Sequence, residues 1–244
     1  MRELIYGRNA VHECLRAGRR DVFRLLVSQG AQASGTLAQA LVLARQKGVP
    51  VQQVLRPQLD KIAQGHQGIV AEVSGYPYVD LEDLLQPSTS LDSLRLLVLD
   101  CLQDPQNLGA LLRTAEAVGV DGVVIARDRA ASVTPAVANA SSGATEHLRI
   151  ARVTNITRTL QTLKEYGVWI AGLEDAPGAQ EYWNSNLTGS IALVVGSEGQ
   201  GIRRLVLQTC DVLVKLPMRG KVTSLNAAVA GSIVLYETFR QSKK

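Results

Sequence analysis

The stretch LVVGSEGQGI, residues 193–202, runs an apolar segment into three glycines within six residues. A glycine-rich turn between a strand and a helix is typical of phosphate-binding loops, which use backbone N–H groups and often a lysine. Here Glu198 stands inside the turn and would repel a phosphate, and Arg203 comes too late to replace that lysine. The turn fits neither GxxxxGK[ST] nor the dinucleotide pattern GxGxxG.

A carboxylate among glycines is better suited to hydroxyl groups, amines or a cation. S-adenosylmethionine, a sulfonium with an amino group and a ribose diol, offers all three and is the first cofactor candidate. The alternative is a tight strand-to-helix turn with a solvated Glu198.

The sequence around this turn predicts an α/β domain. Several of the apolar segments are continuous, as expected of buried parallel strands. Helical segments fall between most of them, and the last and longest covers 224–241. This alternation predicts an open parallel sheet with helices on both faces, whose ligands bind at the carboxyl ends of strands. The expected strands cover residues 94–100, 122–126, 147–153, 168–174, 190–196 and 212–218.

The chain before residue 76 predicts a separate, small α/β domain. Two prolines, four serines or threonines and an acidic cluster in residues 76–93 indicate a linker. The expected domains are therefore 1–75, the linker 76–93 and 94–244. In the first domain we expect helices at 8–17, 35–47 and 57–64 and strands at 22–28, 49–54 and 68–74.

Composition narrows the class of protein. Aromatic residues make up 4% of the chain, which disfavours a base-stacking platform as the main nucleic-acid surface. We find neither a membrane-spanning apolar run nor the apolar segment of a signal peptide, so a cytoplasmic protein is expected. Scattered cysteines and histidines predict reduced thiols and no metal site; they are Cys14, Cys101, Cys210, His12, His66 and His147.

Positive charge is concentrated at the start of the chain. Residues 1–75 hold ten Lys/Arg against five Asp/Glu, whereas residues 96–244 hold fifteen against thirteen. Such an excess is either a solvated basic face or a surface for a phosphate backbone, and charge alone does not separate the two. The candidate backbone contacts are Arg8, Arg16, Arg19, Arg20 and Arg24.

Two further segments carry candidate site residues. In DPQNLGALLRTAEAVG, residues 104–119, Asn107 is expected as a helix N-cap, and Arg113 is either a surface arginine or a cation near a site. In LPMRGKVTSLNAAVAGSIVLYE, residues 216–237, Ser224 is expected as the N-cap, with Asn226 in the first turn. The apolar Leu216, Met218 and Leu225 could surround a flat base or belong to the core.

Together, NLGALLRTAEAVG, LVVGSEGQGI and LPMRGKVTSLNAAVA resemble, in order and spacing, the three motifs of the SpoU–TrmH group of RNA ribose 2′-O-methyltransferases, within the knotted SPOUT superfamily. IYGRNAVHECLRAG and HQGIVAEV also resemble the substrate-binding domain of that group. The likeness covers nearly the whole chain and is greatest to members that methylate guanosine in large-subunit ribosomal RNA. Ala227 and Ala228 depart from the Val–Ser of many members, which hardly affects the chemistry.

The resemblance implies a C-terminal trefoil-knot domain, which the pattern alone would not suggest because knots are close to absent among folds. It also implies S-adenosylmethionine as cofactor, RNA as substrate and a homodimer formed through the C-terminal domain, with the RNA meeting both subunits. Cofactor contacts would come from Val195, Gly196, Ser197, Leu216, Met218, Ser224 and Leu225. The catalytic set would be Asn107, Arg113, Glu198, Ser224 and Asn226.

Methyl transfer requires that the acceptor be activated, because a ribose 2′-hydroxyl is a poor nucleophile. Arg113 is the arginine assigned in this group, sometimes as general base. Since an arginine side chain stays protonated, we favour a guanidinium that orients the adjacent phosphate and stabilises the developing alkoxide. Glu198 would then position Arg113 or accept a hydrogen bond.

Three alternatives stay open at this point. A transfer-RNA 2′-O-methyltransferase would share the chemistry, although many of these lack a separate N-terminal domain. A non-catalytic RNA-binding or ribosome-assembly protein could keep the fold, but the intact polar set argues against it. A nucleotide-dependent oxidoreductase is disfavoured by the missing dinucleotide fingerprint.

Overall fold

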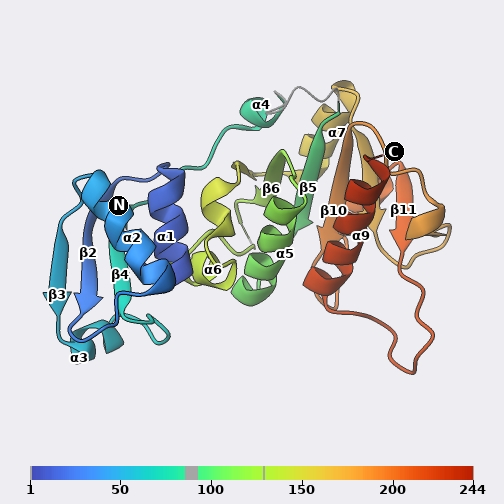
Figure 1. The fold of residues 1–244 in the computed structure, drawn as a ribbon. Helices are drawn as coiled ribbons and strands as arrows, with labels where there is room; N and C mark the ends of the chain where they lie inside the picture. The colour runs from blue at the N-terminus through green and yellow to red at the C-terminus, as the bar shows by residue number, and fades with distance from the viewer. Residues whose placement is uncertain (1, 86–92, 129, 244) are drawn as a thin grey trace. The chain divides into compact units, whose positions relative to one another are not determined.

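The computed structural model describes residues 2–85, 93–128 and 130–243, which form two compact units (Figure 1). The first unit comprises Met1–Pro77 together with Val133–His147, and the second comprises Tyr78–Ser132 and Leu148–Lys244. The chain therefore passes between the units after Pro77, after Ser132 and after His147. Residues 133–147, which the sequence grouped with the C-terminal domain, pack with the N-terminal unit.

The first unit contains a four-stranded sheet. β4 lies between β1 and β2 and is antiparallel to both, whereas β3 pairs parallel with β2 at the edge. Three of these strands fall where alternating and apolar segments predict them; β1 at the start of the chain was not expected. The strands are β1 (Arg2–Tyr6), β2 (Val22–Ser28), β3 (Val51–Val54) and β4 (Ile69–Ser74).

The helices of the first unit are α1 (Arg8–Ala17), α2 (Gly35–Gln46) and the short α3 (Arg56–Asp60). Buried apolar residues of α1, such as Val11 and Leu15, join those of α2 and the sheet in one core. α1 and α2 agree closely with the expected helices, whereas α3 ends earlier than predicted.

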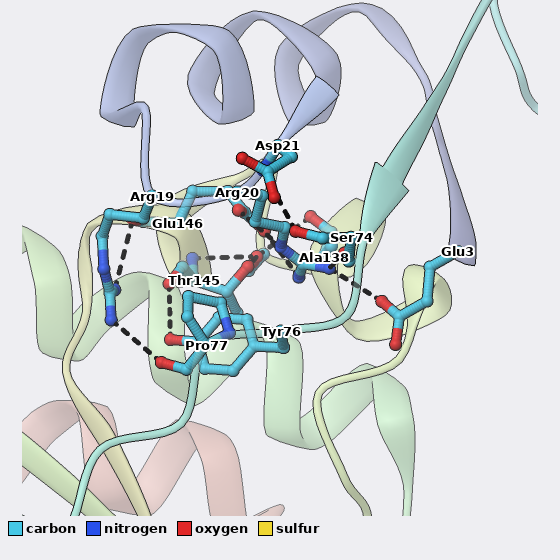
Figure 2. A network of polar contacts seen from close by, with 11 residues as sticks. Glu3, Arg19, Arg20, Asp21, Ser74, Tyr76, Pro77, Ala138, Thr145 and Glu146 are labelled. Atoms are coloured by element: carbon cyan, nitrogen blue, oxygen red, sulfur yellow. Dashed lines mark hydrogen bonds and ion pairs between the residues drawn. The ribbon is translucent and has the colours of Figure 1, made fainter. Parts of the chain in front are cut away.

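A short helix and a helical turn from residues 133–147 complete this unit, α6 (Pro135–Ala140) and η1 (Ala144–His147). A buried ion pair joins them to the rest, as Figure 2 shows: the guanidinium of Arg20 donates to both carboxylate oxygens of Glu146, at 2.9 and 3.0 Å. Arg20 also donates to Glu3 at 2.7 Å, and the Tyr76 hydroxyl donates to the Thr145 carbonyl at 2.9 Å.

The central ion pair of this network is buried. The side chains of Arg20 and Glu146 are 0% and 1% exposed. Burial raises the pKa of the Glu146 carboxyl, although Arg20 opposes that shift. The pair therefore combines strong mutual attraction with a large desolvation cost, and losing one partner would leave a buried charge.

One expected RNA contact is wrong for this reason. Arg20 has no exposed side-chain surface and is already paired with two carboxylates, so it cannot reach a phosphate backbone. Its neighbour Arg19 also turns inward, donating to the carbonyls of Glu146 and Pro77 at 3.4 and 3.3 Å.

The second unit contains a seven-stranded sheet in the order β7-β6-β5-β10-β8-β11-β9, with parallel pairing at every step. Gly196 at the end of β10 stands opposite Asp100 of β5, so the carboxyl ends of these strands share one edge. The strands are β5 (Arg95–Asp100), β6 (Gly122–Ala126), β7 (Ile150–Val153), β8 (Trp169–Leu173), β9 (Gln180–Glu181), β10 (Ile191–Gly196) and β11 (Val212–Lys215).

Helices cover both faces of this sheet. α5 (Pro105–Ala117) and α9 (Ala227–Gln241) lie side by side on one face (Figure 1). Gly231 of α9 lies so close to Val195 that an added Cβ would stand 3.2 Å from its side chain. α7 (Ile156–Glu165) and α8 (Arg204–Thr209) share a core with Val194. Since successive strand residues point to opposite faces, the two helix pairs lie on opposite sides. The expected parallel α/β architecture is confirmed.

The described part of the expected linker has structure of its own. Val79 pairs with Ala151 beside β7, and a one-turn helix, α4 (Leu81–Leu84), buries Leu84 in the core of the second unit. Residues 86–92 of that segment lie outside the described residues. Residues 79–84 of the linker expected at 76–93 therefore belong to the second unit.

We expect the Arg20–Glu146 pair to be a major determinant of the stability of the first unit. Arg20→Ala should lower the free energy of unfolding by about 3–5 kcal/mol, because the buried Glu146 is left without its partner. Glu146→Ala should cost less, because Arg20 keeps its bond to Glu3. The exposed Arg16, paired with Glu13 at 3.3 Å, is a matched control, and Arg16→Ala should cost less than about 1 kcal/mol. Urea denaturation of the whole chain measures all three; equal small losses would contradict the assignment.

Candidate active site

The glycine-rich turn begins where β10 ends and closes on itself. The N–H of Ser197 donates to the Gly201 carbonyl at 3.1 Å, and the N–H of Gly201 donates back at 3.0 Å. A side chain on Gly196 would collide with the Gly201 backbone, and Gly201 has a φ of 66°. The close backbone approach at Gly196 and the left-handed conformation at Gly201 therefore require glycine at both positions.

Two carboxylates from neighbouring strands hold the turn. Glu174, which follows β8, accepts from the N–H of Ile202 at 2.8 Å. Asp100, at the end of β5, is fully buried and accepts from both the backbone N–H and the Nε of Arg203, each at 2.8 Å. The exit of the loop is therefore fixed on both sides, which leaves Glu198 exposed at its tip.

Glu198 brings the three motifs together. Its Oε1 accepts from Nδ2 of Asn107 at 2.8 Å and from Nδ2 of Asn226 at 2.6 Å. The amide of Asn226 also donates to Oδ1 of Asn107 at 2.8 Å. These three side chains come from α5, the glycine turn and the start of α9, and they form a closed triangle.

The helix caps differ from the expectation. Asp104, not Asn107, caps α5 by accepting from the Asn107 N–H at 3.0 Å. Asn226, not Ser224, caps α9 by accepting from the N–H groups of Ala228 and Val229. The proline after Asp104 fits the first helical position, which moves the cap upstream and leaves the Asn107 side chain for Glu198.

A cavity of about 460 Å³ opens beside this triangle at the carboxyl ends of β8, β10 and β11. Both Glu198 and Asn226 line it. All the side chains that the sequence assigned to a cofactor lie in its wall: Val195, Gly196, Ser197, Leu216, Met218, Ser224 and Leu225.

Sequence reasoning missed one side of the cavity. Glu174 and Asp175 contribute carboxylates, and Lys215 contributes an ammonium group that pairs with Asp175 at 3.1 Å. The signal was present, since Glu174 and Asp175 stand at the carboxyl end of the strand expected at 168–174. The wall thus combines apolar side chains with carboxylates, which suits a flat apolar ring joined to a cation and hydroxyl groups.

Arg113 is not among the residues that line this cavity. It lies on the exposed side of α5, six residues after Asn107. Six residues of α-helix advance about 9 Å and turn by about 240°, so the two side chains leave the helix in different directions.

The remaining arginine candidates lie in the first unit. Arg16 and Arg24 are paired with Glu13 and Glu72 at 3.3 and 2.6 Å, and both keep about half or more of their side-chain surface exposed. Arg8 instead donates through Nε to the Gln67 carbonyl at 3.1 Å.

Other kinds of site find little support in residues 2–85, 93–128 and 130–243. There, no group of three or more His, Cys, Asp or Glu side chains could hold a metal ion, and no helix is long and apolar enough to span a membrane. The three cysteines are free, and burial raises the pKa of Cys14 and of Cys210 to about 12, so both are thiols at neutral pH.

Comparison with known protein families agrees with this arrangement. Residues 95–236 match the SpoU rRNA Methylase family, more than half of the chain. The chain belongs to the SpoU rRNA methylase family. Residues 4–79 match the RNA 2′-O ribose methyltransferase substrate-binding domain that accompanies it here. The expected family, and with it an RNA 2′-O-ribose methyltransferase, is confirmed.

Relatives of this SpoU protein include full-length matches. YacO of Bacillus subtilis, assigned to the TrmH family of tRNA/rRNA methyltransferases, is 44% identical over 98% of this chain and 96% of its own. The SpoU methyltransferase AviRb of Streptomyces viridochromogenes, solved with AdoMet, is 26% identical with a TM-score of 0.80, covering 98% of this chain and 90% of its own. A TrmH/SpoU tRNA modifying enzyme of A. aeolicus is 26% identical with a TM-score of 0.56, covering 66% of this chain and 80% of its own.

Substitutions at Asn226 should separate the two roles of this side chain in the SpoU site. Asn226→Ala should lower the free energy of unfolding by about 0.5–2 kcal/mol through loss of the cap, and should lower the methyl-transfer rate. Asn226→Ser keeps a capping oxygen but cannot reach Glu198, so stability should recover while the rate stays low. Thermal denaturation and the transfer rate are measured on both; a rate that recovers with stability would assign Asn226 to capping alone.

Proposed function

We propose that this protein transfers the methyl group of S-adenosylmethionine to the ribose 2′-hydroxyl of a guanosine in large-subunit ribosomal RNA. One observation carries the proposal. Asn107, Glu198 and Asn226 meet beside a cavity whose wall contains every side chain expected to touch the cofactor.

The lining of the cavity fits S-adenosylmethionine. Leu216, Met218 and Leu225 offer apolar surface for the adenine ring, and Glu174 and Glu198 offer acceptors for the amino group and ribose hydroxyls. A carboxylate-rich wall also favours a positively charged ligand over a phosphate. When bound, the cofactor supplies an electrophilic methyl group on a sulfonium.

The polar triangle would act on the acceptor. Both amide hydrogen bonds to Glu198 fall on Oε1, which leaves Oε2 to accept from a substrate hydroxyl or amine. Because Asn107 and Asn226 fix the carboxylate, it is oriented before the substrate arrives. Ser224 lies in the same wall and can donate or accept a further hydrogen bond.

We assign Arg113 the stabilisation of the developing alkoxide and the orientation of the neighbouring phosphate. A guanidinium that stays protonated is suited to both tasks and unsuited to take a proton. Since Arg113 does not line the cavity of its own chain, we propose that it serves the cavity of a second copy in a homodimer. Exposed apolar side chains on and before α9 support such an interface: Val222, Leu225, Val229 and Tyr236.

The substrate-binding unit supports ribosomal over transfer RNA. The A. aeolicus tRNA modifying enzyme matches only 66% of this chain, so about a third of the chain has no counterpart there. The partly buried Arg8 and the exposed Arg16 and Arg24 are our candidates for backbone contacts in the first unit. Such contacts position RNA without reading its sequence.

The proposal predicts labelled methyl transfer to RNA from cells that lack the protein. Wild type should label the large ribosomal RNA on ribose at guanosine, and Arg113→Ala should reduce the rate by about 10²–10³-fold, as for loss of one oxyanion-stabilising donor. Separation of the RNA by size and nuclease digestion to nucleosides identify the product. Arg158→Ala, at an exposed arginine on α7, is the charge-matched control.

The outcomes distinguish the parts of the proposal. Label in transfer RNA would keep the chemistry and replace the substrate, and label on another nucleoside would replace guanosine. Undiminished transfer by Arg113→Ala would remove Arg113 from the site. No label together with no binding of S-adenosylmethionine would leave an RNA-binding protein without activity.

A shared site also predicts rescue between two inactive variants. Arg113→Ala and Leu216→Trp, which fills the cofactor cavity, should each be inactive alone. Random mixing into dimers should restore roughly a quarter of wild-type activity, because half of the dimers contain one intact composite site. Mixing after unfolding and refolding tests this; no recovery, with heterodimers detected by a tag, would place Arg113 in its own chain's site.

A further inference from the structure

The protein has a second cavity, of about 510 Å³, which lies in the first unit. It lies where α1 and α3 begin, where β2 ends and where the chain turns into β4. Its wall consists of Arg8, residues 28–31, Arg56 and residues 67–68. All of these belong to the substrate-binding unit, and the wall contains two guanidinium groups and no carboxylate.

These two arginines differ from others in the same unit. Arg2, Arg16, Arg20 and Arg24 each pair with a carboxylate within 4.0 Å. In the part of the chain that the structure describes, neither Arg8 nor Arg56 forms such a pair. The positive charge around the cavity is therefore not neutralised by the protein.

The part of the cavity wall formed by residues 67–68 is held in a fixed backbone conformation. Gln67 has a φ of 52°, which is uncommon outside glycine. Its side chain accepts from the Arg8 N–H at 3.0 Å, and its carbonyl accepts from Nε of Arg8 at 3.1 Å. The buried His66 accepts from the Gly68 N–H at 2.9 Å and pairs through Nε2 with Asp60.

This arrangement orients the Arg8 guanidinium and leaves its terminal amino groups available to a ligand. The bond through Nε orients the guanidinium, and its terminal amino groups remain to donate to an anion. A backbone conformation that is uncommon and held by surrounding bonds is frequent at ligand sites. Arg56, on another element, faces the same cavity and adds a second positive charge.

We propose that this cavity binds the phosphate of an unpaired nucleotide in the substrate RNA, with Arg8 and Arg56 as its two cationic contacts. This rests on the proposed function only in taking RNA as the substrate. A hollow suits a nucleotide that projects from its strand, whereas a continuous duplex presents a convex backbone with its bases inside. Guanidinium groups match phosphate oxygens and can also stack on a base.

The test measures RNA binding by the whole protein, with fluorescence anisotropy as the readout, over a range of salt concentrations. The probes are an RNA hairpin with a large unpaired loop and a blunt duplex of the same stem. Arg56→Gln and Arg8→Gln should each weaken hairpin binding about tenfold and lower the salt slope by about 0.7, as for loss of one single-strand phosphate contact. Arg45→Gln removes the same charge from an exposed position outside the cavity and should change neither.

If Arg8→Gln disturbs the loop around Gln67, Arg56→Gln still tests the cavity, because the Arg56 side chain makes no hydrogen bond or ion pair with the described residues that its loss would break. Equal weakening by Arg45→Gln, equal loss for hairpin and duplex, or unchanged binding by the double variant would each overturn the cavity assignment. Methyl transfer is measured in parallel. If RNA binding depends on the two arginines but no methyl group is transferred, the proposed function is wrong and this inference stands. If methyl transfer occurs and neither arginine affects it, this inference is wrong and the proposed function stands.

Discussion

The candidate active site depends on the buried carboxylate of Asp100. It ends β5 and binds both the backbone and the side chain of Arg203, so it fixes the point where the glycine turn leaves the sheet. Once that exit is fixed, Glu198 can reach the amides of Asn107 and Asn226. Asn226 in turn begins α9, which packs on α5, and so the site and the helices around it are stabilised by the same few contacts.

Much of the second unit could be predicted from sequence, because buried parallel strands are continuous apolar runs and the turn between β10 and α8 has an unmistakable composition. The wall residues from the two motifs at 193–202 and 216–237, Val195 and Leu216 among them, were expected from the resemblance to a known family. The cap residues could not, since Asn107 and Ser224 are as good caps as Asp104 and Asn226 until the helix start is known. Glu174 and Asp175 were missed because two acids after a strand are usually solvated. The catalytic and cofactor roles themselves remain predictions.

The first unit shows why counting charges is a poor guide to a binding surface. The sequence gives residues 1–75 a large basic excess, yet Arg20 is enclosed by Glu3 and Glu146, and Glu146 lies more than a hundred residues away in the chain. That pairing depends on a long-range contact and leaves no local signal. Only arginines without a carboxylate partner, such as Arg8 and Arg56, leave positive charge available to RNA.

The return of residues 133–147 to the first unit has a consequence for how the protein is made. During synthesis a domain usually folds as soon as its chain has emerged. Here the first unit lacks α6, η1 and Glu146, one of the two carboxylates paired with Arg20, until His147 has been added, by which time the residues of β5 and β6 have also been made. The first unit therefore cannot complete its polar network before part of the second unit has been synthesised, and an exchange of residues 2–77 alone would separate Arg20 from Glu146.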